Sequence, residues 1–93
     1  MSMQSVLHAI IKAKQNQDTT LKITREDIDT LPPQIGELTD LQSLSLKNNG
    51  LTHLPDEIGN LKELTYLMIH NGKIEEMPTS IKKLPKLEKI FFC

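Results

Sequence analysis

The sequence contains few of the residues on which disulfide frameworks, membrane insertion and most catalytic sites depend. Its 93 residues include one cysteine, no tryptophan, one tyrosine and two phenylalanines. A single cysteine excludes an internal disulfide, and no apolar run approaches the ~20 residues of a membrane span. The net charge is −1, which gives no electrostatic case for binding nucleic acid or an anionic membrane. These absences indicate one small domain held together by its apolar core.

The sequence does contain one motif that occurs three times. The segment that begins at Leu31-Pro32 returns at Leu54-Pro55, and a third copy begins at Met77-Pro78. Both steps equal 23 residues, since 54 − 31 = 23 and 77 − 54 = 23. A fixed period of this length is typical of stacked repeats, in which each unit buries its apolar residues against its neighbours.

Each copy predicts a short strand followed by a returning helical turn. Leu44 and Leu46 are two residues apart, so both side chains point to the same face of a strand. Pro55 has no N–H and ends strand pairing, and apolar residues at spacings of three follow it: Ile58, Leu61 and Leu64. The phase predicts four parallel strands near Leu21–Ile23, Leu44–Leu46, Leu67–Ile69 and Ile90–Phe92.

Two dipeptides, Asn49-Gly50 and Asn71-Gly72, support a competing interpretation. Both are strong signals for the tight turn of an antiparallel hairpin. The second strand of such a hairpin would run into Pro55 or Pro78, which cannot donate a ladder hydrogen bond. We therefore predict that the strands pair in parallel.

Residues 2–17 predict an amphipathic helix ahead of the repeats. Ser2 or Ser5 can cap its start, and its apolar residues fall at helical spacing: Val6, Leu7, Ile10 and Ile11. We interpret this helix as a cap on the apolar end of the stack, because a solenoid needs its ends covered. A helix that binds a membrane or a partner is the alternative.

These repeats resemble those of the leucine-rich repeat family, in the variety that carries Leu-Pro-x-x-Ile-x-x-Leu between strands. The resemblance extends from Leu21 to Phe92. It implies an α/β fold, a right-handed leucine-rich repeat solenoid with a short curved parallel sheet of about four strands on its concave face. We expect an N-terminal capping helix in residues 1–18 and the solenoid in residues 19–93, with repeats near 19–30, 31–53, 54–76 and 77–93.

The turns that follow the strands depart from the family pattern. The family places an asparagine there, whose side-chain amide bonds to backbone groups of the turn, and Asn49 fills that position in one repeat. The equivalent positions hold Glu26 and Gly72. We expect the turns at those two levels to be looser or differently bonded.

No group of residues predicts catalysis, a metal or a cofactor. The acidic turn 26–29 lacks the glycine and the later bidentate glutamate of a calcium loop. Cys93 lies 23 residues after His70, on the neighbouring predicted strand, but no oxyanion donor or pocket accompanies this pair. The histidines are otherwise scattered: His8, His53 and His70. We predict that the protein is not an enzyme.

The outward face of the predicted sheet is the candidate binding surface. Its first column is Thr20, Ser43, Tyr66 and Lys89, its second Lys22, Ser45, Met68 and Phe91, and its third Thr24, Lys47, His70 and Cys93. Tyrosine anchors and adaptable methionine contacts are common at binding surfaces. The predicted protein-binding residues are Tyr66, Met68, Phe91, Lys47, His70, Ser43, Ser45 and Lys22.

The resemblance implies a non-catalytic module, an adaptor or recognition domain that binds another protein on its concave face. Cytosolic proteins with this repeat variety include adaptors similar to Ras-pathway scaffolds and the repeats of Roco-type GTPases. Two alternatives remain open. One is a regulatory or substrate-recognition fragment of a larger enzyme. The other is a structural unit that self-associates through its open C-terminal edge, where Leu84, Leu87 and Phe92 are expected to face water.

The sequence favours a cytoplasmic location. The first residues, Met-Ser-Met-Gln-Ser, lack the basic segment and apolar core of a signal peptide. No Asn-x-Ser/Thr glycosylation site occurs. Extracellular proteins of the family usually carry cysteine-rich caps, which a chain with one cysteine cannot form.

Overall fold

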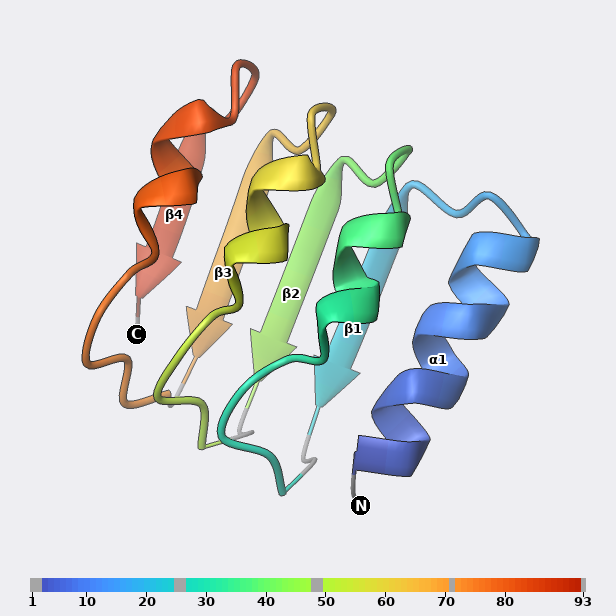
Figure 1. The fold of residues 1–93 in the computed structure, drawn as a ribbon, viewed down its shortest axis with the longest axis horizontal. Coiled ribbons are helices and arrows are strands. Elements are labelled where there is room, and N and C mark those ends of the chain that lie inside the picture. Colours follow the sequence, from blue (N-terminus) through green and yellow to red (C-terminus); the bar gives the residue numbers. More distant parts are fainter. Residues whose placement is uncertain (1–2, 25–26, 48–49, 71, 93) are drawn as a thin grey trace.

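The structure, a computed structural model, describes residues 3–24, 27–47, 50–70 and 72–92. Strands alternate with short 3₁₀ helices, marked η, after one α-helix. In chain order the elements are α1 (Met3–Gln15), β1 (Thr20–Thr24), η1 (Pro33–Glu37), β2 (Ser43–Lys47), η2 (Asp56–Asn60), β3 (Tyr66–His70), η3 (Thr79–Lys83) and β4 (Lys89–Phe92). Figure 1 shows the strands as one layer and the 3₁₀ helices as a second, with α1 at one end of the stack.

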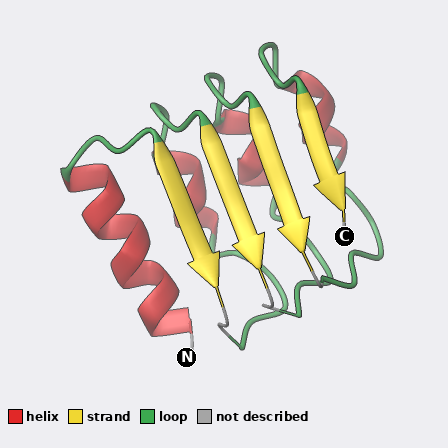
Figure 2. Cartoon of the chain, turned by 180° about the vertical axis from the view of Figure 1, so that it is seen from behind, coloured by secondary structure: helices red, strands yellow, loops and turns green. Residues whose placement is uncertain are grey.

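The strands form one parallel sheet in the order β1-β2-β3-β4, and Figure 2 shows them side by side. Every pairing joins residues that are 23 apart, as between Leu21 and Leu44 or between Leu44 and Leu67. The prediction of parallel strands at these positions is confirmed. The hairpin alternative is wrong, because strands of the described residues pair only in parallel.

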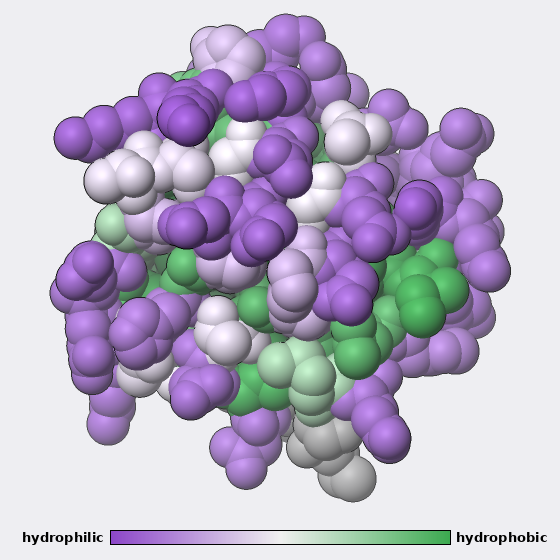
Figure 3. Space-filling view, viewed as in Figure 1, coloured by the Kyte–Doolittle hydropathy of each residue, from purple (hydrophilic) through white to green (hydrophobic). Residues whose placement is uncertain are grey.

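A continuous core fills the space between the sheet and the 3₁₀ helices. The inward strand residues Leu44 and Leu67 are fully buried. So are the three apolar residues that follow the Leu54-Pro55 turn in the repeat of Leu67: Ile58, Leu61 and Leu64. Each repeat therefore contributes one layer of aliphatic side chains, and neighbouring layers complete one another's burial. The opposite surface of the 3₁₀ helices is covered mainly by hydrophilic side chains (Figure 3).

Glycine sets the spacing between consecutive 3₁₀ helices. A Cβ atom added at Gly36 would lie 2.9 Å from the Cβ of Glu57, and one at Gly59 would lie 2.7 Å from the Cβ of Ser80. Real Cβ contacts are longer, so a side chain at either position would push the repeats apart. The third copy of the motif has Lys82 at the same position, since 59 + 23 = 82.

The helix α1 covers the N-terminal end of the core, where it packs against η1 and β1. Val6, Ile10 and Ala13 are at most 2 % exposed. One part of the predicted apolar face is wrong, because Ile11 is 52 % exposed. The buried stripe follows positions i, i+4 and i+7, and Ile11 lies about 100° around the helix from Ile10.

The helix ends two residues earlier than predicted, through a C-terminal turn. Gln17 has a positive φ of 54°. The N–H of Asp18 donates to the carbonyl of Ala13 at 2.9 Å, and the N–H of Gln17 donates to that of Lys14 at 3.1 Å, as in a Schellman motif. At the other end, Ser5 lies inside the helix, so it is not the N-cap, and Ser2 lies outside the described residues.

Backbone groups bond the turn at Gly72 to the preceding repeat. The N–H of Lys73 donates to the carbonyl of Leu51 at 2.7 Å, and the N–H of Glu75 donates to that of Thr52 at 3.0 Å. A Cβ at Gly72 would lie 2.8 Å from the Cγ2 of Ile69, so this turn packs too closely for a side chain. The other two predicted turn positions, Glu26 and Asn49, lie outside the described residues.

The C-terminal end of the core is only partly open. Phe92 is 56 % exposed and Leu87 is half-buried, as expected for core positions of the outermost repeat. The prediction is wrong for Leu84, which is 7 % exposed. Leu84 belongs to the same buried cluster as Leu61 and Leu64 of the preceding repeat, and this inner side suffices to bury it.

Candidate functional site

The outward side chains of the sheet form the predicted grid, which we call the concave face. Parallel register aligns residues one period apart into columns, with outward residues alternating with buried ones along each strand. The described columns are Thr20-Ser43-Tyr66-Lys89, Lys22-Ser45-Met68-Phe91 and Thr24-Lys47-His70. The structure thus brings all eight predicted binding residues to one side of the sheet. Cys93, predicted to extend the third column, lies outside the described residues.

An apolar group occupies the β3 and β4 part of this face. Tyr66 pairs with Lys89 in register, Met68 with Phe91, and the Tyr66 and Phe91 ring centroids are 5.6 Å apart with their planes tilted by 50°. Such ring contacts contribute roughly 0.5–1.5 kcal/mol. Phe91 nevertheless remains 43 % exposed, while Tyr66 and Met68 are half-buried. Mutual packing therefore covers only part of this apolar surface.

Two polar residues beside this group are less accessible than the sequence suggests. Ser45 is 7 % exposed, and its Oγ donates to the Sδ of Met68 at 3.7 Å. Ser45 thus supports Met68 from the neighbouring strand. His70 is half-buried, and its Nδ1 is a buried atom without a hydrogen-bond partner in the described part of the chain. The charged residues Lys22 and Lys47 are exposed, and Ser43 is half-buried.

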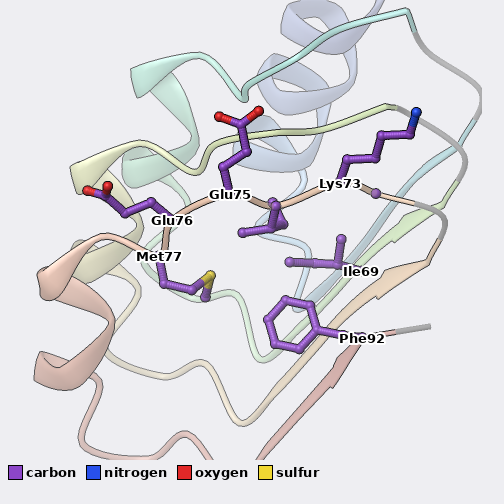
Figure 4. A pocket seen from close by; sticks show the side chains of 8 residues that line it. Ile69, Lys73, Glu75, Glu76, Met77 and Phe92 are labelled. Carbon is purple, nitrogen blue, oxygen red and sulfur yellow. The ribbon is translucent and has the colours of Figure 1, made fainter.

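A second feature is a hollow of about 490 Å³ at the C-terminal end of the core. Figure 4 shows Ile69, Met77 and Phe92 directed toward one another across it, while Glu75 and Glu76 point away. Sequence reasoning did not predict this hollow. The sequence feature that could have predicted it is the spacing of 23 residues between Ile69 and Phe92. This spacing assigns an aromatic core residue to the outermost strand of the sheet.

The described residues show no arrangement suited to metal binding. Within residues 3–24, 27–47, 50–70 and 72–92, no three side chains of the His, Cys, Asp and Glu types come close enough to hold an ion. The pair of His70 and Cys93 is not described, because Cys93 lies outside these ranges. In the same part of the chain, no helix has the length and apolar character needed to cross a bilayer.

Comparison with known proteins agrees with this architecture. A family model described as a leucine-rich repeat region matches residues 19–92. The solved structure of the leucine-rich repeat protein LIC12759 of Leptospira interrogans superposes with a TM-score of 0.64 and 42 % sequence identity. That match covers 69 % of this chain and 16 % of the other protein, so the chain spans a small part of its neighbour's length. No curated protein matches the sequence.

The protein belongs to the leucine-rich repeat family, because the family model spans most of its length. The predicted family and α/β fold are confirmed by this match, by the parallel sheet and by the solved structure. Leucine-rich repeats are a general protein-interaction module, which directs attention to the exposed surfaces of the fold.

Proposed function

We propose that this protein is a non-catalytic, cytoplasmic adaptor or recognition module that binds a segment of another protein on its concave face. The observation that carries the proposal is the apolar group of Tyr66, Met68 and Phe91 on outward positions of regular strands. Removing apolar surface from water contributes about 25 cal/mol of favourable free energy per Å². Phe91 alone is 43 % exposed, so a bound partner can bury apolar surface here. The cytoplasmic location rests on the single cysteine.

The double variant Tyr66→Ala/Met68→Ala tests this proposal. The partner is first isolated by cross-linking to the unmodified protein, and its affinity is then measured by calorimetric titration. We expect the dissociation constant to rise at least about tenfold, or ~1.4 kcal/mol, because two central contacts are lost. The melting temperature should change by only a few degrees, since neither side chain belongs to the buried core.

A matched control replaces two exposed residues on the opposite surface, Glu57→Ala and Lys62→Ala. This control should bind like the unmodified protein. If the Tyr66→Ala/Met68→Ala variant folds normally and binds its partner with unchanged affinity, the concave face is not the binding site.

Self-association through the C-terminal edge is a second candidate, favoured by the exposure of β4. Ile90 is 38 % exposed and Phe92 is 56 % exposed, although both are in phase with core residues. Phe92 also borders the apolar hollow described above. An edge strand with apolar side chains readily pairs with another chain.

Lys82 limits which structures can pack on the C-terminal end of the core. In the two preceding repeats the same position is a glycine, and a Cβ there would collide with the next 3₁₀ helix. A further 3₁₀ helix therefore cannot stack on η3 at the spacing found between η2 and η3. A second copy that meets β4 does not need this close approach, because β4 and η3 lie in different layers (Figure 1).

Sedimentation across a range of protein concentrations tests this candidate. We expect reduced protein to form dimers as its concentration rises, and Phe92→Asp to shift this equilibrium toward monomer. Ile11→Asp, at an apolar residue that is 52 % exposed on α1, should leave the equilibrium unchanged. A reduced protein that stays monomeric up to millimolar concentration would refute self-association.

A further inference from the structure

The described concave face carries charge of only one sign. Its ionised side chains are Lys22 on β1, Lys47 on β2 and Lys89 on β4. None of the strands β1–β4 contains an aspartate or glutamate. Over the whole chain, in contrast, the 12 acidic residues outnumber the 11 lysines and arginines. The positive charge of the sheet is therefore a local feature that the net charge of −1 conceals.

Elsewhere in the structure, the 23-residue period pairs lysines with glutamates. Lys14 lies 2.9 Å from Glu37 and Lys86 lies 2.6 Å from Glu63, measured from Nζ to Oε1. Each of these ion pairs joins residues 23 apart, so the period itself places the carboxylate beside the lysine.

On the sheet the same period brings no carboxylate. Lys22 has Ser45 beside it, Lys47 has Thr24 and His70, and Lys89 has Tyr66. Among the described residues, no ion pair involves Lys22, Lys47 or Lys89. Their ammonium groups are therefore available to a partner, at little cost in broken contacts.

The lysines and the apolar group are arranged side by side. Lys22 and Lys47 are diagonal neighbours on adjacent strands. With strands about 4.8 Å apart and a rise of about 6.6 Å over two residues, their Cα atoms are about 8 Å apart. Next to them lie Ser43 and Ser45, whose small side chains project little above the sheet, and Ser45 is buried. Beyond the serines stands the apolar group on β3 and β4. A bound segment thus meets positive charge over β1 and β2, and over β3 and β4 it meets an apolar surface with Lys89 beside Tyr66.

We propose that the concave face binds an acidic segment of a partner protein. Carboxylates of that segment lie near Lys22 and Lys47, and an aromatic or aliphatic side chain packs on the apolar group. This inference rests on the proposed function and specifies the chemistry of the partner. Complementary charge raises association rates and suppresses wrong partners. A nucleic acid fits less well, because few lysines face it and binding to phosphates draws on many.

The experiment is a selection of short random peptides, displayed on yeast, against the full chain. We expect the enriched peptides to combine a net negative charge with at least one aromatic or aliphatic residue. A synthetic copy of the strongest binder is then titrated against Lys22→Glu/Lys47→Glu. Its dissociation constant should rise at least about tenfold, and its affinity for the unmodified chain should fall as salt is added.

The control Lys62→Glu/Lys83→Glu changes the net charge equally, at exposed positions outside the sheet. It should alter the dissociation constant by less than about twofold, because charges beyond ~8 Å are largely screened at physiological salt. Thermal melts of both variants verify that they are folded. Equal weakening by the two lysine pairs would show that only the net charge matters and would overturn the inference.

Further outcomes separate this inference from the proposed function. Enrichment of neutral or basic peptides, or of none, overturns the acidic partner. So does tighter binding of a thymidine oligonucleotide than of any selected peptide. If Tyr66→Ala/Met68→Ala abolishes peptide binding while Lys22→Glu/Lys47→Glu preserves it, only the charge preference fails. If Tyr66→Ala/Met68→Ala does not change the affinity for any partner, both the proposed binding site on the concave face and the acidic-partner inference fail.

Discussion

Ile10→Asp in α1 is expected to lower the free energy of unfolding of the whole domain by about 2–4 kcal/mol. Ile10 is 1 % exposed and belongs to the same buried cluster as Ile35 of the repeat 31–53. An aspartate there removes apolar contacts and buries a carboxylate without a partner. The melting temperature, followed by circular dichroism, should fall by at least about 8 °C.

Ile11→Asp is the matched control, one residue further along the same helix. Ile11 is 52 % exposed, so the same substitution should change stability by no more than about 0.5 kcal/mol. Small and equal effects at the two positions would mean that α1 does not cap the core in solution. The alternative of a helix that binds a membrane or a partner would then gain support.

The cap also affects the candidate binding site. The helix packs on β1, and β1 carries Lys22, one of the two lysines assigned to an acidic partner. In a repeat protein, stability is approximately a sum of units and the interfaces between neighbours. Loss of the cap should therefore fray β1 first, and binding through Lys22 should weaken before binding through Tyr66 does.

Most of the fold was predictable because one number, the period, controls it. Residues 23 apart occupy equivalent environments, so the phase of Leu44 and Leu67 also placed Leu21 and Ile90 in register. The same phase assigned every outward residue of the concave face to its column. Such long-range information is absent from sequences without repeats, where strand order and register must be inferred from local patterns.

What the period did not predict concerns residues at the ends of the stack. Ile11 was predicted to lie on the buried face of the helix and is 52 % exposed, because a short apolar stripe leaves the rotation of a helix about its axis uncertain by one residue. Leu84 is buried because one neighbouring repeat is enough to cover it. Both positions lack a counterpart on one side, so the averaging over equivalent repeats that made the other predictions secure does not apply to them.

Within the site, side-chain reach was the missing information. The columns predicted that Ser45 lies beside Met68, and the contact from Oγ to Sδ at 3.7 Å follows from how far methionine extends across a strand. The contact of the Tyr66 and Phe91 rings has the same origin, since these residues are diagonal on adjacent strands. Register fixes which Cβ atoms are neighbours, and only rotamers decide which of them remain accessible.

Leu67→Ala and Ile90→Ala change the same repeat position in two environments. We expect the two substitutions to lower the free energy of unfolding by very different amounts. Leu67 is fully buried, whereas Ile90, its partner in register on β4, is 38 % exposed. Truncation at Leu67 should cost about 2–4 kcal/mol, because it leaves a cavity in a packed layer. Truncation at Ile90 should cost less than about 1 kcal/mol, because water and neighbouring side chains occupy the space.

Urea unfolding at low protein concentration measures both values, and the same measurement at high concentration probes the C-terminal edge. If copies of the chain associate through β4, Ile90 becomes buried and its truncation becomes more costly as concentration rises, by mass action. The cost at Leu67 should stay nearly constant, since that side chain is buried in the monomer. Equal costs at the two positions in dilute solution would contradict the exposed position of β4, and a cost at Ile90 that never changes with concentration would argue against self-association.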